Sequence, residues 1–305
     1  EGVEGERMGL WGLLLASLST LLLLLSLHLP LLLLPPAHRN RNAPPILCTR
    51  LLIALLLGAL CTTTLLPHHH WPWTQQPSTH THTHTDTDTD TDTHTPADAW
   101  LAPCWPTLLL FLPPVLRALW HRQSPCQDLW EEGLGRTHST LLCLRNLLVG
   151  PVLEEMVFRG VNLSVLVWNG WAFWPAIVAS SLLFGIAHSH EMVPLLLRSK
   201  ISWGEFCARV GFQVGFTTLF GMYVAYWAMI TGDLVGVIAV HSFCNLMGVP
   251  SFPSRSEDGR LAPVFWALQL LCVAGFVWLC QWLTTLYWIP NHTNPLWVPS
   301  SLPPQ

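Results

Sequence analysis

The chain has 305 residues, a formal net charge of −4 and a strongly apolar composition. Hydrophobic residues make up 51% of it, charged residues only 10%, and the mean hydropathy is +0.41, which lies outside the usual balance of a soluble domain. The composition therefore indicates a membrane protein in contact with the lipid bilayer. It argues against a nucleic-acid partner, because phosphate binding requires a concentrated basic surface.

Apolar stretches long enough to cross a bilayer, which takes about 20 residues as helix, can be drawn eight times along the chain. They cover residues 9–34, 51–66, 99–119, 146–168, 171–189, 210–230, 233–249 and 263–288. We therefore expect an all-α fold, a polytopic membrane bundle of about eight transmembrane helices. The first stretch could also be a cleaved signal peptide, but its apolar run exceeds the roughly 7–15 residues of such a region, which favours a retained span.

The eight expected spans sort the basic residues onto one side of the membrane. These residues are Arg39, Arg41, Arg50, Arg117, Arg122, Arg136, Arg145, Arg198, Lys200, Arg209, Arg255 and Arg260, with Arg7 as the exception. That side is cytosolic by the positive-inside rule, so both termini are expected to face the lumen.

Residues 79–95 alternate Thr with His or Asp and have neither an apolar period nor turn residues. No packed structure is expected there. The histidines could bind metal loosely, but alternating Thr-His is also the translation of a CA dinucleotide repeat, so we interpret the run as non-coding sequence in a gene model and Met8 as the start. The organisation predicted is N-terminal spans and this insert in 1–98, a catalytic bundle in 99–289 with its core motifs in 140–250, and a short tail in 290–305.

The span 146–168 carries three ionisable residues in the sequence LEEMVFRG. Such groups are costly inside a bilayer and usually mark a functional site. Glu155 and Arg159 are four residues apart, so they share a helix face and are expected to form an ion pair. Glu154 points about 100° away and has no cation partner in this helix, which suits a general base. The alternative is that both carboxylates pair with Arg159.

Two further clusters hold polar residues that could join Glu154. His188 lies near the cytosolic end of the span 171–189, where a lone histidine can also be simply interfacial. His241 and Asn245 are four residues apart on one face of the span 233–249, where they could equally serve as hydrogen bonds between helices. The topology places all of them in the cytosolic half of the membrane.

A carboxylate and an imidazole can together hold and deprotonate a water molecule, while a second imidazole and an amide donate hydrogen bonds to a tetrahedral oxyanion. These clusters therefore predict peptide hydrolysis by an activated water. The nine cysteines are scattered, without a CxxC pair of the kind found in zinc or redox sites. Cys244, beside His241, could be a nucleophile, but helix packing is the favoured interpretation.

The three clusters resemble the motifs of a known family, the glutamate-type CaaX prenyl endopeptidases, called Ras-converting endoproteases in eukaryotes. Its motifs EExxxR, FxxxH and HxxxN occur here in order as Glu154-Glu155-x3-Arg159, Phe184-x3-His188 and His241-x3-Asn245. The flanking sequences LRN and HSFCNxMGxP point to the eukaryotic branch. The resemblance covers roughly residues 140–250.

The resemblance implies an intramembrane helical bundle of the endoplasmic reticulum, multi-pass and open to the cytosol, that releases the -aaX tripeptide from farnesylated or geranylgeranylated CaaX proteins such as Ras-type small GTPases. It implies that Glu154 and His188 activate water and that His241 and Asn245 form the oxyanion site. Glu155, Arg159 and Phe184 match supporting positions. Neither a metal nor a cofactor is expected.

Two other functions compete with this one. Zinc proteases use HExxH, but His190-Glu191 is followed by Met192, Val193 and Pro194, so the second ligand is missing and the proline would end the helix. A metal bound by Glu154, His188 and His241 remains geometrically open. A transporter or membrane scaffold would also place acids and histidines inside its bundle, although no internal repeat is present.

Overall fold

The computed structural model describes residues 14, 16–18, 20–21, 98–122, 143–192, 202–249 and 252–287. Almost all of the expected spans 9–34 and 51–66, the insert 79–95 and the tail 290–305 lie outside the described residues. The ordered secondary structure that is described is entirely helical, which confirms the all-α class. The expected number of eight spans is not tested.

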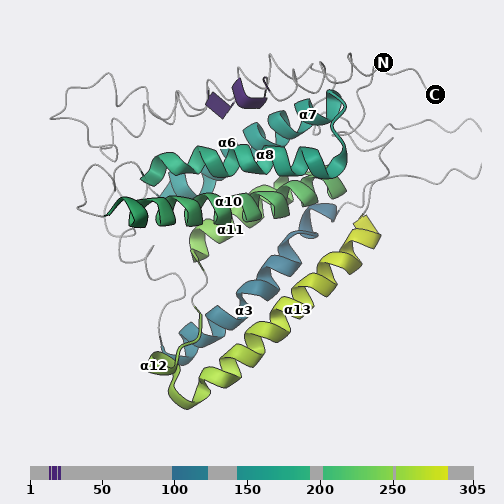
Figure 1. The fold of residues 1–305 in the computed structure, drawn as a ribbon. Coiled ribbons are helices and arrows are strands. Elements are labelled where there is room, and N and C mark those ends of the chain that lie inside the picture. The colour runs from purple at the N-terminus through teal and green to yellow at the C-terminus, as the bar shows by residue number, and fades with distance from the viewer. Residues whose placement is uncertain are drawn as a thin grey trace, which may run out of the picture.

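From residue 98 onward, each expected span that is described corresponds to a helical segment (Figure 1). The elements are η3 (Ala99–Leu101), α3 (Cys104–Trp120), the continuous run of η4 (Arg145–Val149), α6 (Gly150–Glu155), η5 (Met156–Leu163) and α7 (Ser164–Trp168), then α8 (Phe173–His188), η6 (Ser189–Met192), α10 (Trp203–Thr231), α11 (Val235–Met247), α12 (Arg255–Asp258), η7 (Gly259–Leu261) and α13 (Ala262–Tyr287). Within the described part, three helical segments are long and apolar enough to cross a membrane: Ala99–Trp120, Trp203–Thr231 and Arg255–Tyr287. The chain is thus a multi-pass membrane protein.

Helix α10 begins seven residues earlier than the expected span 210–230, at Trp203. Ser202 precedes it in extended conformation, and its hydroxyl oxygen accepts a hydrogen bond from the backbone N–H of Glu205 at 3.2 Å. This Ser-x-x-Glu spacing is that of a capping box. The helix ends at Gly232, whose φ of 65° lies in the left-handed region that glycine adopts without strain.

Helices α8 and α10 run side by side (Figure 1), and two glycines allow their backbones to approach closely. A Cβ added at Gly185 would lie 2.1 Å from Thr218 Oγ1, and one at Gly221 would lie 3.2 Å from Phe184 Cδ1. Neither space could hold a side chain without movement. The two helices are thereby held in a close contact that also brings Arg159 of η5 against α10.

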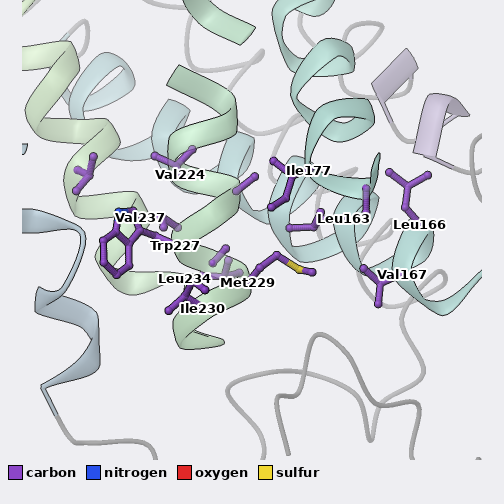
Figure 2. Packing of buried hydrophobic residues seen from close by; sticks show 14 of the residues in the cluster. Leu163, Leu166, Val167, Ile177, Val224, Trp227, Met229, Ile230, Leu234 and Val237 are labelled. Atoms are coloured by element: carbon purple, nitrogen blue, oxygen red, sulfur yellow. The ribbon is translucent and has the colours of Figure 1, made fainter. Parts of the chain in front are cut away.

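The buried apolar core lies where α10 meets the helical run η5–α7, α8 and α11 (Figure 2). Trp227, Met229 and Ile230 of α10 are almost completely buried there, as are Leu163 and Ile177 from the neighbouring helices. Burying such side chains supplies the main favourable term in folding. The core therefore fixes the relative positions of the helices that carry the polar residues.

Helices α3 and α13 pack as a pair that crosses below the others in Figure 1. Their ends nearest α12 are joined by charged groups: Arg117 Nε donates to Asp258 Oδ1 at 2.7 Å, and Arg117 also pairs with Glu257. His121 Nε2 lies 2.7 Å from the same Asp258 oxygen. The short helix α12 is thus tied to the end of α3.

Candidate active site

The helical run that carries both glutamates is not a regular α-helix, because η4 and η5 wind as π-helix. The backbone N–H of Gly150 donates to the carbonyl of Arg145, five residues earlier. A Cβ at Gly150 would lie 2.8 Å from that carbonyl oxygen and 4.0 Å from Glu154 Oε1. The missing side chain at this position lets the π turn form and leaves room for the carboxylate of Glu154. Such π segments occur frequently at functional sites.

Glu155 and Arg159 form the ion pair expected from their spacing, with 3.1 Å between Arg159 Nη1 and Glu155 Oε1. Both residues are completely buried. Arg159 is held from two further sides: its Nη2 donates to the carbonyl of Gly221 at 3.1 Å, and its guanidinium carbon lies 4.4 Å from the ring centre of Phe184. These contacts compensate a charge that would otherwise be costly to bury.

His241 of α11 contacts both glutamates. Its Nδ1 lies 2.7 Å from Glu155 Oε1, and because an ionised carboxylate only accepts, Nδ1 carries the hydrogen. Its Nε2 lies 3.6 Å from Glu154 Oε2. The ring packs edge-on against Phe220 and Phe184. The contact with Glu155 was not predicted from the sequence.

His188 reaches Glu154 from the opposite side. Its Nδ1 donates to the carbonyl of Phe184 at 2.8 Å, because a carbonyl oxygen can only accept. Its Nε2 therefore faces Glu154 Oε2, at 3.6 Å. The ring centre also lies 4.4 Å from that of Phe184. Both imidazoles thus have their Nδ1 atom committed and direct Nε2 at one carboxylate oxygen.

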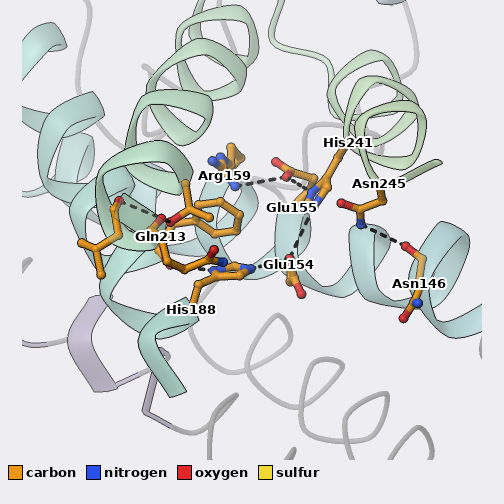
Figure 3. A network of polar contacts seen from close by, with 11 residues as sticks. Asn146, Glu154, Glu155, Arg159, His188, Gln213, His241 and Asn245 are labelled. Carbon is orange, nitrogen blue, oxygen red and sulfur yellow. Dashed lines mark hydrogen bonds and ion pairs between the residues drawn. The ribbon is translucent and has the colours of Figure 1, made fainter. Parts of the chain in front are cut away.

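The structure therefore brings Glu154, His188 and His241 together from three separate helices (Figure 3). The two separations of 3.6 Å are longer than a hydrogen bond, so a small molecule can be shared between these groups. The side chain of Glu154 is 24% exposed, against 16% for His188 and 5% for His241. Glu154 is thus the most accessible member of a mostly buried cluster.

Asn245 lies one helical turn from His241 at the edge of this cluster (Figure 3). Its Nδ2 donates to the backbone carbonyl of Asn146 at 3.0 Å, rather than to a member of the cluster. An amide nitrogen has two hydrogens, so this bond engages one of them. It also ties α11 to the start of the helix that bears Glu154.

The alternative sites are placed less suggestively. Cys244 packs against the apolar core cluster, which agrees with the helix-packing interpretation. The side chains of His190 and Glu191 are outside the described part. Among the described residues, no group of three or more His, Cys, Asp or Glu side chains has an arrangement that could hold a metal ion.

Comparison with known proteins places the same region in a family. Residues 136–247 match the family described as type II CAAX prenyl endopeptidase Rce1-like. The chain is 34% identical to human CAAX prenyl protease 2 over 193 residues, which is 60% of this chain and 57% of the relative. It is 33% identical to the Arabidopsis thaliana protein of that name over 156 residues, 50% of this chain and 49% of the relative.

A probable CAAX prenyl protease 2 of Schizosaccharomyces pombe is 30% identical over 138 residues, 45% of this chain and 51% of the relative. The chain thus spans about half the length of the curated relatives it matches. No solved structure is significantly similar. The matched segment contains every residue of the three motifs, so the resemblance seen in the sequence is confirmed, and residues 136–247 form an Rce1-like region.

Proposed function

We propose that the chain is an intramembrane endopeptidase that removes the C-terminal -aaX tripeptide from farnesylated or geranylgeranylated CaaX proteins, Ras-type small GTPases among them. The names of the relatives support the reaction class. The observation that carries the mechanism is the position of Glu154 Oε2, 3.6 Å from the Nε2 atoms of both His188 and His241.

Glu154 and His188 activate the water molecule in this proposal. Since Nδ1 of His188 donates to the Phe184 carbonyl, the neutral ring presents a lone pair at Nε2. A water between Nε2 and the Glu154 carboxylate would donate one hydrogen to each. Its own lone pair then points outward, toward the carbonyl carbon of the scissile bond, and Glu154 accepts the proton as that bond is attacked.

His241 and Asn245 stabilise the oxyanion that follows. With Nδ1–H directed at Glu155, His241 can donate from Nε2 only as an imidazolium. That cation would balance the buried charges, since Glu154 and Glu155 are negative while Arg159 is positive. Asn245 would supply the hydrogen of Nδ2 that the Asn146 carbonyl does not take. Donors preorganised in a dry site are worth much more than in water.

The proposed location is the endoplasmic reticulum membrane, with the active site open to the cytosol. The support is the placement of basic residues, which the positive-inside rule assigns to the cytosolic side. Arg145 lies in η4 and Arg209 near the start of α10, both beside the helix ends that approach the Glu154 cluster. A soluble prenylated protein would reach the cluster from that side.

The function is tested by expressing the chain in a host that lacks its own tail-trimming enzyme and following a farnesylated CaaX reporter by mass spectrometry. We expect loss of the last three residues, and no cleavage of the same reporter without its prenyl group. An intact reporter beside normally inserted protein would contradict the proposal and favour a scaffold. Activity abolished by a chelator and restored by a metal ion would favour the metal-dependent alternative.

Replacing Asn245 with alanine is expected to lower kcat by about 10²–10³, the usual cost of removing one oxyanion donor. Asn245→Asp is the matched variant, because it keeps the shape but replaces the donor with an acceptor, and it should be at least as impaired. Steady-state cleavage of a farnesylated peptide separates the two kinetic constants. An effect confined to KM would show that Asn245 contributes only to substrate binding.

A further inference from the structure

An enzyme that releases a tripeptide has to recognise the free end of the chain, and the proposed function therefore raises the question of what receives the terminal carboxylate. That group is an anion three residues from the scissile bond. It enters a site that already holds the carboxylates of Glu154 and Glu155, so it requires a cation at the correct distance.

Two of the arginines near the cluster are already engaged by carboxylates. Arg159 is completely buried and pairs with Glu155. Arg209 of α10 pairs with Glu205 at 2.6 Å, so that pair is neutral overall. Arg145, at the start of η4, is half-buried, and the one contact described for its Nε is with a neutral group, the side-chain oxygen of Asn146, at 2.8 Å.

The π turn sets the distance between Arg145 and the reacting groups. Glu154 Oε1 lies 4.0 Å from the position of a Cβ on Gly150, so the carboxylate reaches back along the helix toward its N-terminus. Arg145 is one π turn before Gly150, about 7 Å along the axis at the rise of a regular helix. An extended tripeptide spans about 10 Å, which matches the separation of the Glu154 carboxylate from the Arg145 side chain.

Asn146 connects this arginine to the proposed oxyanion donor. Its side-chain oxygen accepts from Arg145 Nε, and its backbone carbonyl accepts from Asn245 Nδ2. The guanidinium and the Asn245 amide are thus held on the same edge of the cluster by one residue. A peptide whose scissile carbonyl faces Asn245 would extend its last residues along η4.

We propose that Arg145 binds the C-terminal carboxylate of the substrate and so determines that cleavage falls three residues from the end. A guanidinium presents a planar pair of donors that fits a carboxylate with two parallel hydrogen bonds. The anchored end and the Glu154–His188 pair then act as the two fixed points of a ruler. This inference rests on the proposed endopeptidase activity and adds its specificity-determining residue.

The experiment compares two farnesylated peptides that differ only at the end, one with a free carboxylate and one with a carboxamide, using the full chain in membranes. For the wild type we expect kcat/KM to be at least about tenfold higher for the acid, the factor for one charge-assisted hydrogen bond. In Arg145→Gln, the acid should be cleaved about tenfold more slowly while the amide is unchanged, so the preference disappears. Arg145→Lys should keep part of it.

Arg260→Gln is the matched control, because it removes the same charge from an exposed position in η7. It should retain the full preference for the acid, which separates a specific contact from a general loss of positive charge. Equal cleavage of acid and amide by the wild type would overturn the proposal without any variant, and so would an unchanged preference in Arg145→Gln. If the wild type cleaves neither peptide, the endopeptidase activity itself has failed, and the inference fails with it.

Discussion

Glu154→Gln is expected to lower kcat for a farnesylated CaaX peptide by about 10²–10⁴, the range that a positioned general base contributes. The amide keeps the size of the side chain, but it cannot take the proton of the attacking water. It would also direct either a neutral oxygen or an NH2 group at the two imidazoles. Membrane insertion and stability should stay close to the wild type, because Glu154 is the most exposed member of the cluster.

Two further variants make this result specific. His188→Ala should cause a loss of the same order, because it removes the second group that holds the water. Glu205→Gln, on the exposed start of α10, removes one carboxylate outside the cluster and should leave cleavage unchanged. Near-normal turnover by Glu154→Gln in purified, correctly inserted protein would rule out the proposed mechanism.

Arg159→Met is expected to destabilise the folded protein by about 3–5 kcal/mol, the cost of removing one partner from a buried ion pair. It removes the bonds from Arg159 to Glu155 and to the carbonyl of Gly221, together with the contact on Phe184. The remaining carboxylate of Glu155 is completely buried. The measurement is thermal unfolding in detergent, followed by the fraction of protein that stays monodisperse.

A surface pair and a double variant serve as controls for this loss. Arg209→Met breaks the ion pair with Glu205, in which Arg209 is 52% exposed, and should cost under about 1 kcal/mol. The double variant Glu155→Gln with Arg159→Met leaves no uncompensated charge, so it should recover much of the stability. An Arg159→Met protein that unfolds at the wild-type temperature would show that the buried pair contributes little.

Local patterns were sufficient to predict much of the fold. The helices from residue 98 onward follow from apolar length, and the pairing of Glu155 with Arg159 follows from a spacing of four. The early start of α10 was missed, although the sequence contains its signal. Ser202 and Glu205 have the spacing of a capping box, and the hydrogen bond between them is present.

The contacts that complete the candidate site could not be read from spacing in the sequence. His241 and Glu155 are 86 residues apart, and Asn245 and Asn146 are 99 apart. Which polar groups meet over such separations depends on how the helices pack, and here the packing depends on close approaches at Gly185 and Gly221. The π turns were equally hidden, because no local pattern distinguishes them from α-helix.

The π turn between Arg145 and Gly150 has a consequence for the kinds of change this segment can accept. Loss of one residue there would allow the stretch to rewind as ordinary α-helix, and everything before it would swing by about 100° relative to Glu154. Asn146 would then lose its alignment with Asn245. Conservative exchanges can be absorbed in this stretch, whereas a single-codon deletion would take its two ends out of phase.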